Sequence, residues 1–372
     1  MKKRIMCVFG TRPEAVKLAP VVKVLRSSTK LTPIIVLTGQ HREMLDQMLD
    51  WFSLEPDFDL DLMRHGQSLA QLTASVISEM DQLLNSVKPD FVLVQGDTAT
   101  VMAAAMTAFY HKIPVGHVEA GLRTDDRYSP FPEEMARRLT THLSTLHFAP
   151  TKSAVDNLRR EGVIENVFLT GNTVIDALLD TIARLDKASI DKKLFDGVDF
   201  EKFRVLLVTA HRRENWGSGI SDIAKALRQL ADQFPDTQIL YPIHRNPVVR
   251  QSVEPVFTGH KRMFLIEPLD YVPFVYAMQK SYLILTDSGG VQEEAPTVKK
   301  PVLVLRENTE RPQAVEVGAA RLVGTQEENI ISVASLLLTD KKAYDKMICN
   351  ENPYGDGHAA EKILNELEKY LS

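Results

Sequence analysis

The segment "LILTDSGGVQEEAP" (residues 283–296) contains the unit from which the whole fold is built. Its first residues, "LILT", form an apolar run that is typical of a buried strand. Ser288, Gly289 and Gly290 then permit a sharp turn, and the next residues begin a short helix that Pro296 ends. A strand, a glycine turn and a helix in this order predict one repeat of a parallel α/β sheet.

Two adjacent carboxylates, Glu293 and Glu294, follow the glycine pair, and two explanations compete for them. In the first, the glycines only allow the turn, and the acids offset the positive end of the helix dipole. In the second, backbone N–H groups at the helix start bind a phosphate, and a carboxylate one turn later accepts hydrogen bonds from sugar hydroxyls. The second explanation describes a nucleotide site, and this segment alone does not decide between them.

The same alternation of apolar runs and helical patterns continues along the chain. The runs are "IMCVF" 5–9, "PIIVL" 33–37, "FVLVQ" 91–95, "PVGHV" 114–118, "LHFAP" 146–150, "NVFLT" 166–170, "RVLLVTA" 204–210, "TQILYPI" 237–243, "RMFLIEP" 262–268, "YLILTD" 282–287, "PVLVLR" 301–306 and "ARLVG" 320–324. Runs that are apolar on both faces and separated by helices indicate parallel sheets covered on both sides. A polar stretch near 186–203 interrupts the alternation, so we expect a linker there between two doubly wound domains.

Polar loops follow several of the predicted strands. They are "GTRPEAVK" 10–17, "GDTAT" 96–100, "EAGLRT" 119–124, "HRREN" 211–215 and "DSGG" 287–290. Ligands of doubly wound sheets bind at the carboxyl ends of the strands, and two facing domains form a cleft between those ends. We therefore expect these loops to line one binding cleft.

Composition narrows the class of protein. The 372 residues, 44% of them hydrophobic, suffice for two domains, and a formal net charge of −5 argues against a general nucleic-acid or membrane-surface binder. The two cysteines, Cys7 and Cys349, do not suggest a disulfide scaffold, and no metal-ligand cluster is visible in the sequence. No run approaches the roughly 18 apolar residues of a membrane span, and the first apolar run is too short for a signal peptide. We expect a cytoplasmic protein.

Several named catalytic motifs are missing from the sequence. No loop has the pattern of a P-loop, and the nearest match to a dinucleotide fingerprint, "GSGISD" 217–222, has Asp222 in place of the third glycine and no strand directly before it. A serine-hydrolase elbow and a zinc-protease motif are missing as well. P-loop ATP hydrolysis, nicotinamide chemistry and these two hydrolytic reactions therefore lack their key residues.

The loops supply groups that bind anions or transfer protons. The cationic candidates are Arg12, Lys17, Arg123, His211, Arg212, Arg213 and Arg311, and the acidic candidates are Asp97, Glu119, Glu133 and Glu134. Each residue alone has an ordinary explanation as a solvated cation, a structural histidine or a helix-capping acid. Their shared position after strands favours a site for a phosphorylated substrate.

Ten segments carry a more specific resemblance. They are "FGTRPEAVKLAP", "LTGQHREMLDQ", "VQGDTAT", "PVGHVEAGLRT", "YSPFPEEMARR", "LTGNTVIDAL", "TAHRREN", "LTDSGGVQEEAP", "RENTERPQA" and "NPYGDGHAAE". Together they resemble the bacterial non-hydrolysing UDP-N-acetylglucosamine 2-epimerases, and the resemblance runs from Arg4 to the final helix.

The resemblance implies a glycosyltransferase-B-like architecture, in which two Rossmann-like doubly wound domains face each other across a cleft. The N-terminal domain would comprise residues 1–170 plus 356–372, the latter a helix that crosses back, and the UDP-binding domain would comprise residues 171–355. The resemblance also implies UDP-N-acetylglucosamine and UDP as ligands, a homodimer, and no metal or other cofactor. The product would supply envelope polysaccharide synthesis, without indication of which polymer.

The implied reaction is reversible inversion at C2 of the sugar, which gives UDP-N-acetylmannosamine. The C2 proton is not adjacent to a carbonyl, so a base cannot simply remove it at a useful rate. Anti elimination of UDP to 2-acetamidoglucal, followed by re-addition of UDP and of a proton on the opposite face, avoids that difficulty. This path needs an acid and a base on different faces of the sugar, and fixed positive charge at the departing diphosphate.

The resemblance assigns roles to individual residues. It implies that Asp97, Glu119 and Glu133 are the catalytic carboxylates, without assignment to a sugar face, and that His211 lies beside the diphosphate. The implied substrate-binding residues are Arg12 and Lys17, Phe274 at the uracil, Ser288, Gly289 and Gly290 at the diphosphate, Glu294 at the ribose, and Arg311 on the nucleotide side. Glu293 is left out of the site, because nothing in the sequence distinguishes it from a surface acid that compensates the helix dipole. Residues 352–357 are expected to form a turn and cap before the last helix.

Some family members carry a second, regulatory UDP-N-acetylglucosamine site. Here that site would use Gln40, His41, Arg42 and Gln67. The chain has Glu43 where some members have Gln, and Gly66 where some have Arg. Regulation is therefore left open.

Three other activities are compatible with the same loops. A hydrolysing 2-epimerase would release N-acetylmannosamine and UDP, and a sugar transferase on the same fold would need an acceptor. A catalytically silent nucleotide-sugar-binding protein is the third. The presence of all three catalytic carboxylates argues against the silent protein.

Overall fold

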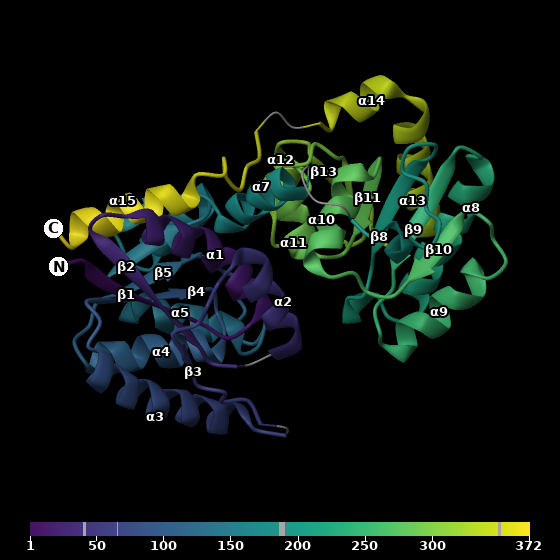
Figure 1. Ribbon diagram of the computed structural model, residues 1–372. Helices are drawn as coiled ribbons and strands as arrows, with labels where there is room; N and C mark the ends of the chain where they lie inside the picture. Colours follow the sequence, from purple (N-terminus) through teal and green to yellow (C-terminus); the bar gives the residue numbers. More distant parts are fainter. Residues whose placement is uncertain (40–41, 65, 186–189, 349–350) are drawn as a thin grey trace. The chain divides into compact units, whose positions relative to one another are not determined.

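The computed structural model describes residues 1–39, 42–64, 66–185, 190–348 and 351–372 and divides the chain into two compact units (Figure 1). Unit 1 comprises Met1–Ala177 and Tyr354–Ser372, and unit 2 comprises Leu178–Pro353. Each unit contains one parallel sheet with helices packed against it. The predicted α/β class with two doubly wound domains is confirmed.

The sheet of unit 1 has the strand order β3-β2-β1-β4-β5-β6-β7, and its paired strands are parallel. The strands are β1 (Lys3–Phe9), β2 (Leu31–Leu37), β3 (Phe58–Asp59), β4 (Phe91–Gln95), β5 (Val115–Val118), β6 (Leu146–Ala149) and β7 (Val167–Leu169). The helices are α1 (Arg12–Ser27), α2 (Arg42–Phe52), α3 (Leu69–Val87), α4 (Ala99–Tyr110), α5 (Glu133–Leu143), α6 (Lys152–Arg160), α15 (Ala359–Tyr370) and the start of α7 (Thr173–Leu185). Because helices cover both faces, the inner strands are buried apolar runs, as in β4.

The sheet of unit 2 has the order β10-β9-β8-β11-β12-β13 and is also parallel. The strands are β8 (Arg204–Thr209), β9 (Thr237–Pro242), β10 (Met263–Ile266), β11 (Leu283–Thr286), β12 (Val302–Val304) and β13 (Ala320–Leu322). The helices are α8 (Ser218–Gln233), α9 (Pro247–Phe257), α10 (Tyr271–Lys280), α11 (Gly289–Glu294), α12 (Pro312–Glu316), α13 (Glu327–Thr339) and α14 (Lys341–Lys346), with short 3-10 helices η1 (Lys192–Phe195) and η2 (Arg213–Asn215).

Both sheets reverse their winding direction between two inner strands. In unit 1 the reversal lies between β1 and β4, and in unit 2 it lies between β8 and β11. Ligands of doubly wound sheets bind outside the carboxyl ends of the strands at such a reversal, because the following loops part in opposite directions there. The loops after these four strands are therefore the places where each unit can hold a ligand.

The loop after β1 is fixed by a capping box. The Thr11 hydroxyl accepts a hydrogen bond from the Glu14 N–H at 3.4 Å, and Glu14 Oε2 accepts from the N–H groups of Gly10 at 2.7 Å and Thr11 at 3.1 Å. Pro13 stands in the first turn of α1, where its missing N–H costs nothing. The chain therefore enters α1 at one defined residue and places Arg12 at the helix start.

The last helix, α15, packs beside α1 in unit 1, which contains both ends of the chain (Figure 1). The Ser28 hydroxyl donates to Glu368 at 2.7 Å, and Asp176 accepts from the Ala360 N–H at 2.8 Å. Within the turn before the helix, the Tyr354 carbonyl accepts from the Asn172 N–H at 2.7 Å. These contacts attach the end of the chain to unit 1.

Two features of the predicted organisation differ from the structure. The two-residue strand β3 was not predicted, because two residues are too few to show a pattern. The polar stretch near 186–203 is not a linker in its described part, since residues 190–203 belong to unit 2. There Phe195 is buried and its ring contacts those of Phe200 and Tyr276.

Over the described part of the chain, none of the helices combines the length and the apolar character that crossing a membrane requires. Cys7 is a buried free cysteine in β1, and Cys349 lies outside the described residues.

Candidate functional site

Unit 1 brings its predicted site residues to the carboxyl ends of neighbouring strands. Arg12 begins α1 after β1, Asp97 follows β4, and Glu119 directly follows β5. Glu133 is the first residue of α5. Arg12 is half-buried, and its side chain has no hydrogen bond or ion pair with another described residue. The carboxyl end of this sheet therefore gathers three carboxylates and a guanidinium.

Glu119 is the most closely held of these carboxylates. The Lys17 ammonium lies 2.6 Å from Oε1 and 2.7 Å from Oε2, and the side-chain amides of Gln95 and Asn172 also donate to the carboxylate, the latter at 3.3 Å. The backbone of Glu119 has a φ of +67°, a left-handed conformation that side chains other than glycine rarely adopt. Such a conformation persists only where neighbouring contacts hold it, and it directs Glu119 toward these three donors.

Asp97 is paired with an arginine that the sequence did not single out. Arg137 on α5 donates from Nη2 to Asp97 Oδ2 at 2.5 Å. Burial raises the pKa of Asp97 above its ordinary value, Glu119 and Glu133 raise it further, and Arg137 and Lys17 oppose that rise. A raised pKa brings a carboxyl group closer to the neutral range in which general acids and bases are most effective.

A buried histidine forms a hydrogen bond with the loop that bears Asp97. His117 Nε2 lies 2.7 Å from the carbonyl oxygen of Gly96, and since a carbonyl only accepts, Nε2 carries the proton. Burial lowers the pKa of His117 to about 3, so the ring is neutral at physiological pH. His117 is therefore a structural donor to the Asp97 loop.

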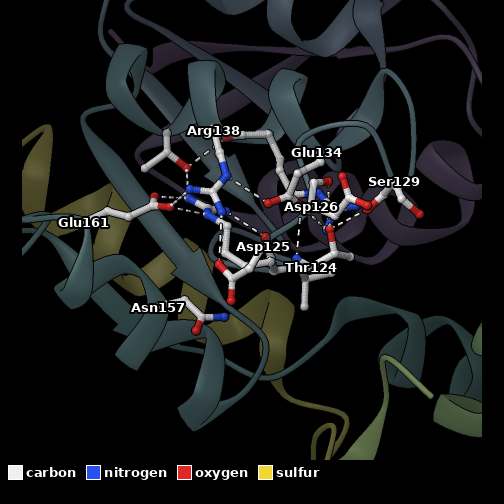
Figure 2. A network of polar contacts seen from close by, with 12 residues as sticks. Thr124, Asp125, Asp126, Ser129, Glu134, Arg138, Asn157 and Glu161 are labelled. Atoms are coloured by element: carbon white, nitrogen blue, oxygen red, sulfur yellow. Dashed lines mark hydrogen bonds and ion pairs between the residues drawn. The ribbon is translucent and has the colours of Figure 1, made fainter. Parts of the chain in front are cut away.

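Glu134 belongs to a network of polar contacts that also includes Thr124, Arg138 and Glu161 (Figure 2). Its side chain has 0% exposure; Oε1 accepts from Arg138 Nε at 2.8 Å, and Oε2 accepts from the Thr124 N–H at 3.1 Å and lies 3.4 Å from Arg137 Nη1. Arg138 in turn donates to Glu161 at 2.6 Å. Glu134, a candidate acid or base from the sequence, instead ties the start of α5 to the loop after β5.

Arg123, a predicted anion-binding candidate, belongs to the same network. Its Nε and Nη2 donate to the two oxygens of Glu161 at 2.9 and 2.6 Å, and its side chain has 1% exposure. Its Nη1 donates to the Leu122 carbonyl at 2.7 Å. The charge of Arg123, one of the cationic candidates, is therefore paired with the Glu161 carboxylate in this structure.

Unit 2 places His211 after β8 and Asp287 after β11, the neighbouring strand. Asp287 is fully buried, and its Oδ2 accepts from the N–H groups of His211 and Arg212 at 2.8 Å and from the Asn215 side chain at 3.0 Å. His211 Nδ1 lies 3.5 Å from Asp287 Oδ1, and the ring stacks on that of His244 with centroids 5.4 Å apart. Burial lowers the pKa of His211. Asp287 thus fixes the backbone of the loop that bears His211 and lies beside its ring.

A buried arginine holds the other end of the same loop. Arg306 donates from Nε to Glu214 at 2.5 Å and from Nη1 and Nη2 to Glu310 at 2.7 and 3.0 Å. These hydrogen bonds lower the pKa of Glu310 to about 2. The segments "HRREN" and "RENTERP", which are distant in the sequence, are therefore joined by one charged cluster. Arg213 lies over the Trp216 ring, 5.9 Å from its centroid, at the surface.

The opening segment folds as predicted into β11, a turn and the short helix α11, with Ser288 at the N-cap. Glu293, which the sequence did not distinguish from a surface acid, is not at the surface. Its carboxylate is buried and accepts from Arg311 Nε at 2.8 Å. Arg311 was predicted as a nucleotide-side contact, and the structure brings it to the first turn of α11, next to Gly289.

The structure gives the positions of the other residues predicted to contact the nucleotide, and their roles stay predictions. Glu294 is buried at the end of α11, and burial together with Glu294 raises the pKa of Tyr271 on α10. Phe274 is half-buried on the same helix. Their roles at a ribose and a uracil stay predictions.

The predicted regulatory residues fall largely beyond what can be described. Gln40 and His41 lie outside the described residues, and Arg42 begins α2. Gln67 accepts from the Arg64 N–H at 3.2 Å and donates to Ser75 at 3.5 Å. The regulatory assignment stays a prediction. Within the described ranges, no group of three or more histidine, cysteine, aspartate or glutamate side chains could hold a metal ion.

Sequence reasoning missed five residues that hold the predicted ones. Gln95 and Asn172 contact Glu119, Arg137 contacts Asp97, Asp287 holds the His211 loop, and Glu293 holds Arg311. For Arg137 a signal existed, because it lies four residues after Glu133 on one helix face. For Asn172 none existed, since its partner is distant in the sequence.

Several known proteins similar to this chain are named UDP-N-acetylglucosamine 2-epimerase. A family model described as UDP-N-acetylglucosamine 2-epimerase matches residues 23–368. The UDP-N-acetylglucosamine 2-epimerase of Bacillus subtilis is 50% identical over 369 residues, which cover 99% of this chain and 96% of that protein. The Neisseria meningitidis enzyme of the same name, solved bound to UDP-GlcNAc, has a TM-score of 0.90 and 48% identity and covers 98% of this chain and 100% of its own. An S. aureus structure solved with UDP has a TM-score of 0.89 and 46% identity, with 99% and 97% covered.

Proposed function

Because the chain belongs to the UDP-N-acetylglucosamine 2-epimerase family, we propose that it interconverts UDP-N-acetylglucosamine and UDP-N-acetylmannosamine without releasing free sugar. The observation that carries the proposal is the pairing of carboxylates with cations at neighbouring strand ends, within a chain that matches the family over nearly its full length. Asp97 contacts Arg137, and Glu119 contacts Lys17.

The chemistry proceeds by elimination and re-addition of UDP. Cleavage of the C1–O bond moves its electron pair onto the diphosphate, a base takes the C2 proton, and 2-acetamidoglucal forms. Return of the diphosphate oxygen to C1 and of a proton to the opposite face of C2 gives the epimer. Each direction uses one acid and one base, and no net proton is consumed.

Asp97, Glu119 and Glu133 are the proton-transfer groups of this proposal. The raised pKa of Asp97 suits a group that must exchange a proton within each catalytic cycle. Lys17, Gln95 and Asn172 fix the orientation of the Glu119 carboxylate. Such preorganisation lowers the barrier because the groups need not reorient when charge develops.

We assign the binding of the nucleotide mainly to residues of unit 2. The N–H groups of Gly289 and Gly290 at the start of α11, with Arg311 beside them, suit the diphosphate, and Glu294 suits ribose hydroxyls. His211 adds a donor for the departing diphosphate, with Asp287 holding it in place. Arg12 and Phe274 complete the proposed substrate contacts.

Incubation with UDP-N-acetylglucosamine in D₂O, followed by NMR at C2, tests the reaction. We expect the C2 proton signal to disappear as the manno product accumulates, with no acceptor added and no effect of a metal chelator. Free N-acetylmannosamine as the main product would instead establish the hydrolysing activity. Product formation only with an acceptor would establish a transferase, and binding of UDP without turnover would establish a silent binding protein.

A single substitution tests the assignment of Asp97. Asp97→Asn keeps the size of the side chain but cannot exchange the proton, so we expect it to bind UDP like the wild type and to lose most turnover. Wild-type turnover in this variant would remove Asp97 from the mechanism.

The remaining family expectations are part of the same proposal. They are a homodimer, a cytoplasmic location and supply of an envelope polysaccharide. Light scattering on the purified chain gives the oligomeric state directly, and a monomer over the working concentration range would overturn the first of them.

A further inference from the structure

The carboxylate of Glu293 is buried beneath the first turn of α11, against the guanidinium of Arg311. Arg311 Nε donates to Glu293 Oε1 at 2.8 Å, and the two side chains have 24% and 4% exposure. A buried carboxylate is costly unless it is paired, so this position requires a cation. Arg311 comes from the segment after β12, distant in the sequence from α11.

Gly289 makes room for that guanidinium. A Cβ built on Gly289 would lie 3.3 Å from both Cζ and Nε of Arg311 and 3.5 Å from Nη1, which is tighter than ordinary packing. The absence of a side chain therefore lets the guanidinium lie directly on the first turn of α11. The N–H groups that a helix leaves unpaired at its start are in that same turn.

Further hydrogen bonds fix both partners of the ion pair. Asn352 Nδ2 donates to the Glu293 carbonyl at 2.8 Å and to Thr297 at 2.6 Å. The Thr309 hydroxyl accepts from the Arg311 N–H at 3.0 Å and donates to Gln292 on α11 at 2.6 Å. Thr309 thus attaches the segment that bears Arg311 to Gln292 of α11, and Asn352 holds the backbone of Glu293.

We propose that Glu293 is a positioning residue, which holds the Arg311 guanidinium over the first turn of α11 so that it binds the diphosphate of a UDP-sugar. The assignment rests on the proposed function. An unpaired arginine side chain must be ordered when a ligand binds, and a carboxylate that orders it in advance removes that cost.

Glu293 could also have the opposite effect on UDP binding, and this makes the inference testable. A carboxylate close to a diphosphate site also repels the ligand, so a Glu293 that only neutralised Arg311 would weaken binding. Removing the charge would then tighten the complex with UDP. Positioning and neutralisation therefore predict changes of opposite sign in the same measurement.

The experiment measures the Kd of UDP by calorimetry for the purified full chain and its variants. For Glu293→Gln we expect UDP binding to weaken about tenfold, since the amide accepts only a neutral hydrogen bond and charge-assisted ones are roughly twice as strong. Asp236→Asn is the matched control. It removes the carboxylate of a 2.8 Å ion pair with Arg204 at the opposite end of β8, and we expect it to leave the Kd unchanged.

A double variant separates positioning from a general structural role. If Glu293 acts through Arg311, Glu293→Gln/Arg311→Met binds UDP no more weakly than Arg311→Met alone. Independent losses that multiply would overturn the inference. Unchanged or tighter binding by Glu293→Gln would overturn it as well.

Two further measurements test the inference if Glu293→Gln does not fold or if the wild type does not epimerise its substrate. If Glu293→Gln does not fold, Glu293→Asp keeps the buried charge but withdraws it by one methylene, and we expect intermediate UDP binding; wild-type affinity in that variant would refute positioning. Epimerisation by the wild type is measured separately. A wild type that binds UDP without epimerising it would overturn the proposed function, while the Kd series would still decide the role of Glu293.

Discussion

Replacing Arg137 by methionine is predicted to raise the pKa of Asp97 and to shift the pH dependence of epimerisation upward. Arg137 Nη2 lies 2.5 Å from Asp97 Oδ2, and the Asp97 side chain has 29% exposure. Burial, Glu119 and Glu133 already raise this pKa, while Arg137 and Lys17 lower it. Without Arg137, Lys17 would remain to oppose the rise.

The size of the shift follows from the geometry. At 2.5 Å and an effective dielectric constant of about 20, the pair interacts by roughly 7 kcal/mol, which is an upper bound because Asp97 is partly exposed to water. Opposite charges at such distances typically lower a carboxyl pKa by about 1–3 units, or about 1.4–4 kcal/mol. We therefore expect Arg137→Met to raise the pKa of Asp97 by about 1–3 units.

The assay is the pH profile of kcat/KM for the wild type, Arg137→Met and Arg137→Lys. Because kcat/KM reports ionisations of the free enzyme, one limb of the profile should move upward by about 1–3 pH units. If Asp97 must be ionised, the acidic limb moves and activity below neutral pH falls. If Asp97 must be protonated, the alkaline limb moves. The lysine variant keeps the charge and should show a smaller shift.

The outcome that refutes this reasoning is an active Arg137→Met variant whose two limbs both coincide with those of the wild type. The control for folding is UDP binding, which we assign to unit 2 and expect to be unchanged. Glu134 keeps its hydrogen bonds to Arg138 and to the Thr124 N–H in this variant, so the start of α5 should stay in place.

Three further substitutions test the supports around the site. Glu134→Ala removes a buried carboxylate of the network in Figure 2, and we expect hydrogen exchange of α5 to show that unit 1 is destabilised by about 3–5 kcal/mol. Asp156→Asn on α6, which breaks an exposed ion pair, is the control and should cost under about 1 kcal/mol. Equal protection in the two variants would contradict the buried role of Glu134. Asp287→Asn should lower kcat/KM about tenfold, since hydrogen bonds to a charged group contribute roughly 1.5–3 kcal/mol; steady-state kinetics equal to the wild type would reject the proposed hold on His211. The pKa of His117 is about 3 in the folded state and about 6.5 in the unfolded state, so only the unfolded state binds a proton as the pH falls from 6.5, and stability is lost. His117→Gln should therefore remove about 2 kcal/mol of the difference in the free energy of unfolding between pH 7 and pH 5. Urea unfolding with an unchanged pH dependence would count against this role of His117.

The sheets and the site loops could be predicted because one physical rule sets both. Strands buried on two faces must be apolar along their whole length, and each such run in the sequence corresponds to a strand. In a parallel sheet all carboxyl ends lie at one edge, so Asp97 after β4 and Glu119 after β5 had to come close. This reasoning needs no knowledge of side-chain contacts.

The partners of the site residues could not be predicted in the same way. Glu119 is held by Lys17, Gln95 and Asn172, which come from three different segments, and only the packed fold brings them together. The pairing of Arg123 could not be predicted for the same reason, because its partner Glu161 lies on the far side of β6 in the sequence. A cation after a strand looks the same whether a ligand or a buried carboxylate neutralises it.

The two adjacent carboxylates of α11 are a second case in which the sequence could not predict the partners of a residue. Successive helical residues point roughly 100° apart, so Glu293 and Glu294 cannot face the same neighbour. Glu293 is directed to Arg311, whose approach the missing side chain of Gly289 permits, while Glu294 lies near Tyr271 on α10. Neither acid lies in the first turn of α11, where compensation of the helix dipole would act. Gly289 and Glu293 instead meet the same guanidinium, because the glycine leaves room for Arg311 and the Glu293 carboxylate accepts its hydrogen bond.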